Sequence, residues 1–175
     1  MVACIGCSKP AEQIEVQYAD ENGITQSAQM KLASNPSIVS YLLYVPLDWT
    51  IKDQSASTVA YVSKENPSSV SVAQWNLTTE LRTIDAWWAI HKDENAKTMP
   101  EFTVIEEGTP LTVNGIEAKS YTYTVRFSGG IYKYNVIAVI AQGSIHVITY
   151  TSTEELYDQA YPTFRGPILA GFKFN

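Results

Sequence analysis

Both cysteines of this 175-residue chain, Cys4 and Cys7, lie within its first ten residues. Each follows a small residue, in Val2-Ala3-Cys4 and in Ile5-Gly6-Cys7. In a bacterial lipobox, a small residue likewise precedes the cysteine that receives a lipid and becomes the mature N-terminus, and the apolar part of the signal would then lie upstream of Met1. The pattern therefore predicts lipid attachment at Cys4 or Cys7.

A polar segment, residues 8–13, follows the cysteines, as a linker between a membrane and a folded domain would. The remaining length is typical of one domain, on the usual range of roughly 100–200 residues each. We therefore expect a tether over residues 1–13 and a single domain over residues 14–175.

The same Cys-x-x-Cys spacing has two other interpretations. A redox pair usually opens a helix beside a strand, where the helix N-terminus lowers the thiol pKa, and no such pattern surrounds Cys4 and Cys7. A structural zinc site needs four ligands, and the sequence has no third cysteine. A third alternative, two ordinary thiols of an intracellular protein, also stays open.

The chain contains only two histidines, His91 and His146. A hydrolase triad needs a nucleophile, a base and an orienting group within reach of one another, and no Gly-x-Ser-x-Gly elbow is present. His91 falls on the apolar stripe of an expected helix, and His146 shares the face of an expected strand with Ile148 and Tyr150. We interpret both as packing residues and expect no catalytic residue and no cofactor.

Two arrangements could bind a cation. His91 and Glu94 have the i, i+3 spacing that brings two helical ligands together, and Glu106-Glu107 beside Gly108 could bind a hard cation weakly. No EF-hand loop is present, so we expect no dedicated metal site. His91 and Glu94 remain candidates for a metal-binding regulatory module. A second alternative, a carboxylate-based hydrolase, would need two facing carboxylates among the 18 acidic residues.

Charge excludes several classes of partner. The 12 Lys and Arg residues form no run of three, and the formal net charge is −6. Nucleic-acid binding depends on clustered basic side chains that neutralise phosphates, so we exclude it. Direct attraction of the fold to anionic lipid is disfavoured for the same reason. No apolar run reaches the roughly 18 residues of a membrane span.

One helix is expected before Pro100, with Thr83 as its N-cap and Asp85 in the first turn. Four residues recur at helical spacing and should face a sheet. They are Leu81, Ile84, Trp88 and His91. Asp93 and Glu94 should lie on the opposite side.

Strand patterns fill most of the remaining sequence. The expected strands are Ile14–Ala19, Ile38–Val45, Thr58–Ser63, Ser68–Trp75, Phe102–Glu107, Ile116–Phe127, Ile131–Ala141 and Ser144–Thr151. Asn114-Gly115 is the favoured signal for a type I′ hairpin turn. The strand Ile116–Phe127 has one polar face, which predicts partial exposure, whereas Val136–Ile140 is apolar on both faces, which predicts a central strand covered on both sides.

Several short stretches of the sequence, taken in order, resemble those of a known protein family. They are Val45-Pro46-Leu47-Asp48-Trp49, Asn114-Gly115-Ile116, Ala118-Lys119-Ser120-Tyr121, Val147-Ile148-Thr149-Tyr150-Thr151-Ser152, Glu154-Glu155-Leu156-Tyr157-Asp158 and Phe164…Ile168…Gly171-Phe172. In this order, the chain from Ile38 to Phe174 resembles the PsbP family, named for the extrinsic photosystem II subunit. The resemblance implies an α+β fold, an α/β/α sandwich with a central, mainly antiparallel sheet. Chloroplast members dock through a basic N-terminal segment that this chain lacks, so no role in oxygen evolution is expected.

PsbP-like domains also occur as bacterial envelope lipoproteins, which agrees with the lipobox interpretation. We therefore expect a non-enzymatic binding or accessory module in the bacterial cell envelope, extracytoplasmic and membrane-anchored. Its contact with the membrane would be through the N-terminal lipid only. Its partner would be another protein or a small ligand.

Overall fold

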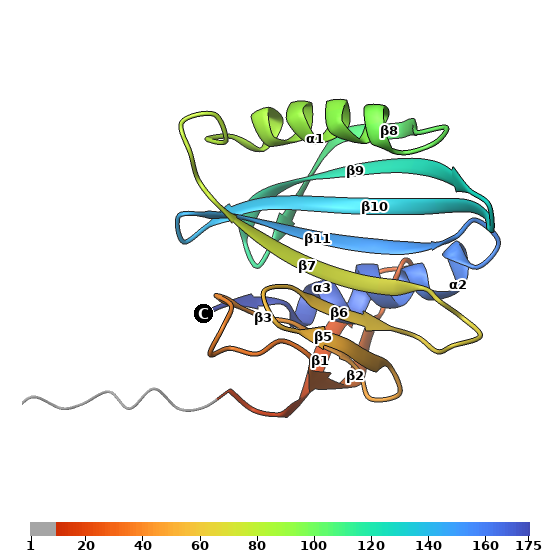
Figure 1. Ribbon diagram of the computed structural model, residues 1–175. Helices are drawn as coiled ribbons and strands as arrows, with labels where there is room; N and C mark the ends of the chain where they lie inside the picture. Colours follow the sequence, from red (N-terminus) through yellow and green to blue (C-terminus); the bar gives the residue numbers. More distant parts are fainter. Residues whose placement is uncertain (1–9) are drawn as a thin grey trace, which may run out of the picture.

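The computed structural model describes residues 10–175, and its centre is a seven-stranded antiparallel sheet (Figure 1). The strands follow the order β5-β6-β7-β11-β10-β9-β8. Their bounds are β5 Thr50–Gln54, β6 Thr58–Tyr61, β7 Ser69–Asn76, β8 Thr103–Val113, β9 Ile116–Phe127, β10 Gly130–Ala141 and β11 Ser144–Thr153. The expected strands Thr58–Ser63 and Ser68–Trp75 are confirmed as the antiparallel pair β6 and β7, while the short edge strand β5 was not predicted.

A different layer covers each face of this sheet (Figure 1). Helix α1 (Ile84–Thr98) lies on one face. The other face carries the C-terminal helical segment and two smaller sheets. These elements are α2 (Tyr157–Thr163), the π-helical turn η1 (Phe164–Ile168), α3 (Leu169–Gly171), the sheet of β1 (Gln13–Ala19), β2 (Thr25–Leu32) and β4 (Tyr44–Pro46), and the pair β3 (Tyr41–Leu42) and β12 (Lys173–Phe174). The mixed α+β class is confirmed.

Strand β10 lies between β9 and β11 and is apolar on both faces, as predicted. Val136 and Ala138 join the core under α1, while Ile137 and Val139 join the core on the opposite face. Successive strand residues point to opposite faces, so one central strand supplies both cores.

The polar face of β9 differs from the expectation of partial exposure. Ser120 and Thr122 are buried, and Asn135 of β10 donates hydrogen bonds to both hydroxyls at 2.8 and 3.0 Å. Buried polar groups are tolerated where they are hydrogen-bonded to one another. The polar sequence pattern therefore reflects a buried network, and on this face Thr124 is half-buried and Arg126 is exposed.

The predicted strand Ile38–Val45 is wrong as a single element. Asn35 accepts the Ile38 amide at 2.9 Å and forms a turn, which leaves Ile38 58% exposed. The chain then pairs as β3 with β12 and as β4 with β2. The segment is apolar because it links two sheets within the core, and strand pairing is interrupted between them.

The predicted turn at Asn114-Gly115 is confirmed, and both residues have positive φ angles of 54° and 78°. Strand β8 is an irregular edge strand that extends well beyond the expected Phe102–Glu107, with register shifts on either side of Glu106. Within residues 10–175, no helix combines the length and the apolar character that crossing a bilayer requires.

Candidate functional site

A groove of about 620 Å³ opens between α1 and the edge of the sheet at β8 and β9. Most of its lining comes from α1, and the remainder from two neighbouring strands. The lining residues are Asp85, Trp88, Ala89, Lys92, Asp93, Ala96, Glu107, Gly108 and Tyr121. The lining therefore contains three carboxylates, one ammonium group and an aromatic pair, and Asp93 is paired with Lys97 of the same helix.

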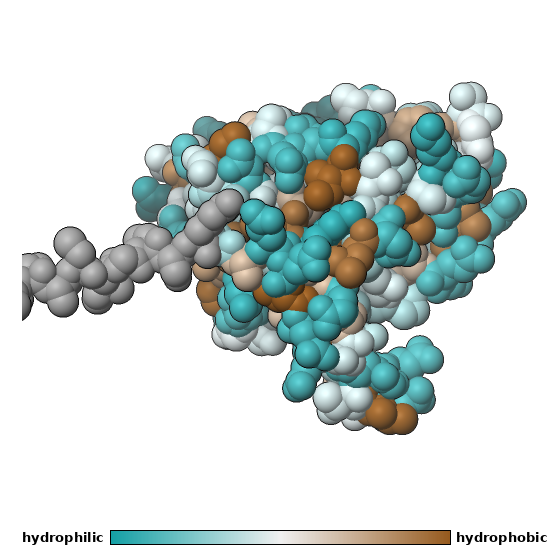
Figure 2. All heavy atoms as spheres, turned by 90° about the horizontal axis from the view of Figure 1, so that it is seen from below, coloured by the Kyte–Doolittle hydropathy of each residue, from teal (hydrophilic) through white to brown (hydrophobic). Residues whose placement is uncertain are grey.

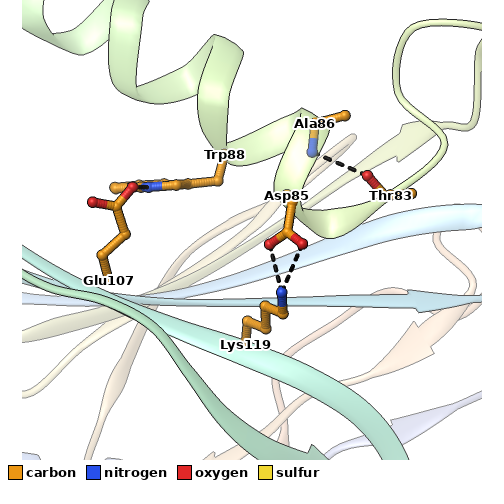
Figure 3. A network of polar contacts seen from close by, with 6 residues as sticks. All are labelled: Thr83, Asp85, Ala86, Trp88, Glu107 and Lys119. Atoms are coloured by element: carbon orange, nitrogen blue, oxygen red, sulfur yellow. Dashed lines mark hydrogen bonds and ion pairs between the residues drawn. The ribbon is translucent and has the colours of Figure 1, made fainter.

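The N-terminus of α1 positions the first of these carboxylates. Thr83 is the N-cap, and its Oγ1 accepts the amide hydrogen of Ala86 at 3.1 Å (Figure 3). This bond satisfies one of the amides that lack a partner inside the helix. Asp85 in the first turn then pairs with Lys119 of β9, whose Nζ lies 2.5 and 2.7 Å from the two carboxylate oxygens.

The helix face toward the sheet is mostly the predicted one. Trp88 is 4% exposed, and Leu81 and Ile84 pack against the same core, while Asp93 and Glu94 are exposed. Trp87 and Asn95 are also buried and were not predicted. Helical spacing predicts the centre of the buried face of the helix. The space that the sheet leaves for side chains decides how many neighbouring residues are buried with it.

Trp88 and Tyr121 form the base of the groove. Their rings are stacked with centroids 4.2 Å apart, and both side chains are almost fully buried. The indole Nε1–H of Trp88 donates to Glu107 Oε1 at 2.6 Å, so the buried tryptophan binds a carboxylate at the groove wall (Figure 3).

Glu107 is held in an ion pair as well. Lys92 Nζ lies 3.1 and 2.9 Å from its two carboxylate oxygens. Hydrogen bonds from Lys92 and then from Trp88 hold the pKa of Glu107 below its usual value. Glu107 is therefore an anionic acceptor at neutral pH and is a poor candidate for an acid catalyst.

The hydroxyl of Tyr121 is buried and has no hydrogen-bond partner among residues 10–175. Burial, followed by the negative charges of Asp85 and Glu107, raises the pKa of Tyr121 to about 12. The phenol therefore stays neutral, and it is an unused donor and acceptor between two carboxylates.

The two glutamates considered as a cation site do not act together. Glu106 accepts hydrogen bonds from Thr109 at 2.6 Å and from Thr122 at 3.4 Å, whereas Glu107 bonds with Trp88 and Lys92. Successive strand residues point to opposite faces. The acidic pair is thus divided between the two sides of the sheet.

His91 lies on α1 beside the groove, stacked on Trp87 with ring centroids 4.7 Å apart. Asn95 Nδ2 lies 3.0 Å from its Nε2. Burial lowers the pKa of His91, and the charge of Glu94 opposes this shift. No cluster of three or more His, Cys, Asp or Glu side chains that could hold a metal ion occurs in the described part of the chain.

The structure brings together a serine and a histidine that the sequence did not connect. Ser40 Oγ lies 3.0 Å from Nε2 of the fully buried His146, and it donates to Gln74 Oε1 at 2.9 Å. Burial lowers the pKa of His146 to about 4. The pair is separated by 106 residues, so no local spacing could have indicated it.

Ser40 and His146 are poorly arranged for nucleophilic catalysis. The serine hydroxyl already donates to Gln74. The other ring nitrogen, His146 Nδ1, lies near the Ser144 backbone but makes no hydrogen bond of acceptable geometry to any residue from 10 to 175. A triad needs an acceptor there to orient the imidazole. The contact instead fastens the segment before β3 to β7 and β11.

No family model matches the chain, and no curated protein matches it. Several solved structures match the chain. Cyanobacterial PsbP (CyanoP) from Synechocystis sp. PCC 6803 aligns over 99% of both chains, with a TM-score of 0.58 and 12% identity. The chain has a PsbP-like fold.

Two further structures share the PsbP-like fold. LpqN of Mycobacterium tuberculosis, described as involved in cell envelope biogenesis, has a TM-score of 0.54 and 14% identity, over 84% of this chain and 91% of LpqN. The Ran-binding protein Mog1p of Saccharomyces cerevisiae has a TM-score of 0.56 and 11% identity, over 83% of this chain and 95% of Mog1p. At these identities the likeness extends to the fold alone.

The PsbP-like fold does not account for the chemistry of the groove, because one fold hosts many functions. The groove depends on this chain's own side chains, chiefly Trp88, Glu107 and Tyr121. Cys4 and Cys7, the predicted lipid attachment sites, lie outside the described residues.

Proposed function

We propose that this protein is a non-enzymatic binding or accessory module of the bacterial cell envelope, held at the membrane by a lipid on Cys4 or Cys7. It uses the groove between α1 and β8 to engage its partner. The observation that carries this proposal is the groove itself, in which paired charges lie beside a buried tyrosine hydroxyl that has no hydrogen-bond partner within residues 10–175.

The electrostatics of the acidic residues favour binding over acid–base catalysis. Three described carboxyl groups have shifted pKa values, those of Asp20, Asp53 and Glu107, and all three are lowered. In each case the main cause is a hydrogen bond donated to the carboxylate. A carboxylic acid that protonates a leaving group needs a raised pKa. These three carboxylates are suited to accepting hydrogen bonds.

The position of Pro10, where the described chain begins, supports a tether. The described chain begins at Pro10, near β1 and on the side of the sheet opposite α1 (Figure 1). Tyr44 Oη donates to Ala11 O at 3.0 Å and fixes this start. A lipid a few residues upstream would therefore leave the groove on the far side, accessible to a partner.

The surface on that side favours attachment through a lipid. Figure 2 shows hydrophobic residues in small, separated groups among hydrophilic ones. Binding to a membrane by the fold itself would require a continuous apolar patch or a basic surface. The structural likenesses add analogies, since LpqN is described as involved in cell envelope biogenesis and Mog1p as Ran-binding.

Metabolic labelling with a palmitate analogue tests the tether. We expect the full-length protein to be labelled and membrane-associated, and we expect labelling to be lost in either Cys4→Ala or Cys7→Ala, whichever removes the modified thiol. A protein that stays soluble and unlabelled would contradict the tether.

A photo-crosslinking amino acid placed at Ala89, an exposed groove residue, tests the binding face in cells. The matched control is Ala170 of α3, which is exposed on the opposite layer. We expect a specific adduct from position 89 that is absent from position 170. Equal adducts from both positions, or none from position 89, would exclude this groove as the binding face.

A further inference from the structure

We infer that the groove is a receptor for one guanidinium group, the arginine side chain of a protein partner. This inference rests on the proposed binding function and specifies its ligand. Its basis is the set of acceptors that line the groove, the carboxylates of Asp85 and Glu107 and the hydroxyl of Tyr121.

The lining of the groove offers acceptors for a cation. It includes the carboxylates of Asp85, Asp93 and Glu107, which are paired with Lys119, Lys97 and Lys92, and of these three lysines only Lys92 belongs to the lining itself. The net charge of the whole chain, −6, has the same sign as these carboxylates. A cationic side chain would therefore be attracted at long range and would find acceptors at short range.

The protein's own lysines show that both carboxylates accept cationic donors. Lys92 pairs with Glu107, and Lys119 pairs with Asp85, from the rim of the groove. The two lysine side chains are 43% and 35% exposed. Exposed ion pairs stabilise by only about 0–1 kcal/mol, so an incoming group that makes two hydrogen bonds could displace either lysine at little cost.

The hydroxyl of Tyr121 distinguishes this site from an ordinary acidic surface. Its residue is 1% exposed, and the oxygen has no hydrogen-bond partner among the residues described. A buried polar group without a partner costs about 1–3 kcal/mol, so a donor that reaches it regains that free energy. The local field of Asp85 and Glu107 makes a positively charged donor the favourable one.

An opening in the edge strand gives access to these acceptors. Gly108 has a φ of +73° and lies where the β8–β9 register shifts between Glu106 and Thr109. A Cβ built at Gly108 would meet nothing within 4 Å. Apart from its two chain neighbours, no residue therefore crowds the rim at Gly108. Guanidinium, with five N–H donors in a rigid fork, matches several acceptors at different angles better than a compact ammonium does.

The test uses the full chain labelled with ¹⁵N and titrated with N-acetyl-arginine amide. The matched probe is N-acetyl-citrulline amide, which has the same shape without the charge. We expect saturable shifts of the Trp88 indole and Gly108 amide resonances, with a millimolar dissociation constant. Citrulline should bind at least about tenfold more weakly, and N-acetyl-lysine amide should fall between the two.

Three variants separate this site from a general charge effect. Glu107→Gln and Tyr121→Phe should each weaken arginine binding about fivefold or more, whereas Glu106→Gln, which removes an acid outside the groove lining, should leave it unchanged. Tyr121→Phe removes a hydroxyl that has no hydrogen-bond partner in the described part of the chain, so it should keep the fold intact. Its loss of affinity would therefore not arise from unfolding.

Equal binding of citrulline and arginine, or unchanged binding in Glu107→Gln, would overturn the inference. Shifts at the same resonances with N-acetyl-glutamate amide but not with arginine would also overturn it, while leaving a binding groove in place. If no probe shifts these resonances, the guanidinium site is excluded, and the crosslinking result at Ala89 then decides separately whether the groove binds a partner at all.

Discussion

The indole Nε1–H of Trp88 donates to Glu107 Oε1 at 2.6 Å and thereby joins the helix above the sheet to the edge strand β8. The same carboxylate accepts Lys92 from the solvent side. One residue of an irregular edge strand thus connects the buried aromatic core to the charged wall of the groove. This contact means that residues lining the groove also stabilise the fold.

The Trp88–Glu107 contact can be tested through two substitutions of one residue. Glu107→Ala leaves the part-buried indole N–H without an acceptor, and we expect it to lower the free energy of unfolding by about 1–3 kcal/mol. Glu107→Gln keeps an acceptor oxygen and loses only the half-exposed ion pair, so we expect a loss below about 1 kcal/mol. Urea unfolding followed by tryptophan fluorescence measures both. Equal losses would mean that the indole bond contributes nothing.

The contribution of the α1 N-cap to stability can be tested by removing its side-chain acceptor. Thr83→Ala removes the acceptor of the Ala86 amide and should cost about 1 kcal/mol of unfolding free energy. Thr79→Ala is the matched control, because Thr79 is exposed and precedes the helix. Its expected cost is within about 0.5 kcal/mol. Thermal unfolding of the two variants decides the matter, and the interpretation fails if Thr79→Ala is the more destabilising.

A close approach between Gly166 and Tyr18 explains the glycine in η1. A Cβ at position 166 would lie 2.6 Å from Tyr18 Cδ2, well inside van der Waals contact. Gly166→Ala should therefore destabilise the protein by about 1–3 kcal/mol. In a Tyr18→Ala background the added cost should shrink, because the two changes share one contact.

Gly129→Ala controls for the loss of a glycine as such, since its Cβ would meet only Tyr132 Oη, at 3.8 Å. We expect a change within about 0.5 kcal/mol for this surface position. Urea unfolding of all four variants provides the comparison. A Gly166→Ala cost that persists in full without the Tyr18 ring would place its origin elsewhere.

The buried His146 predicts a loss of stability in mild acid. Its pKa is lowered to about 4 in the folded protein, whereas in the unfolded chain the pKa of this histidine is about 6.5. Between these values the unfolded state binds more protons, so stability falls as the pH decreases. We expect a loss of about 2 kcal/mol between pH 7.5 and pH 5.

Urea unfolding at both pH values measures this loss, and it should largely disappear in His146→Gln. In His91→Gln, which removes the other histidine, most of the loss should remain, because Trp87 and Asn95 leave His91 half-buried while His146 is fully buried. A pH dependence carried by His91 alone would contradict the assignment.

Local sequence determined much of this fold. Asn114-Gly115 specifies a hairpin because both residues adopt positive φ readily, and Thr83 begins a helix because its side chain replaces a missing backbone acceptor. The central strand is evident from Val136–Ile140, because burial on both faces excludes polar residues. These signals lie within a few residues, so they can be read without knowing what packs against them.

Tertiary structure decided which distant residues meet. Ser40 and His146 become neighbours across 106 positions, and Trp88 meets Glu107 across 19. The apolar segment from Ile38 to Val45 was expected to be one strand, yet it divides between partners that come from opposite ends of the chain. Apolar character favours burial of a segment but does not determine which strand the segment pairs with. That choice depends on the free energy of the whole packed assembly, in which closing long loops is offset only when all the layers dock together.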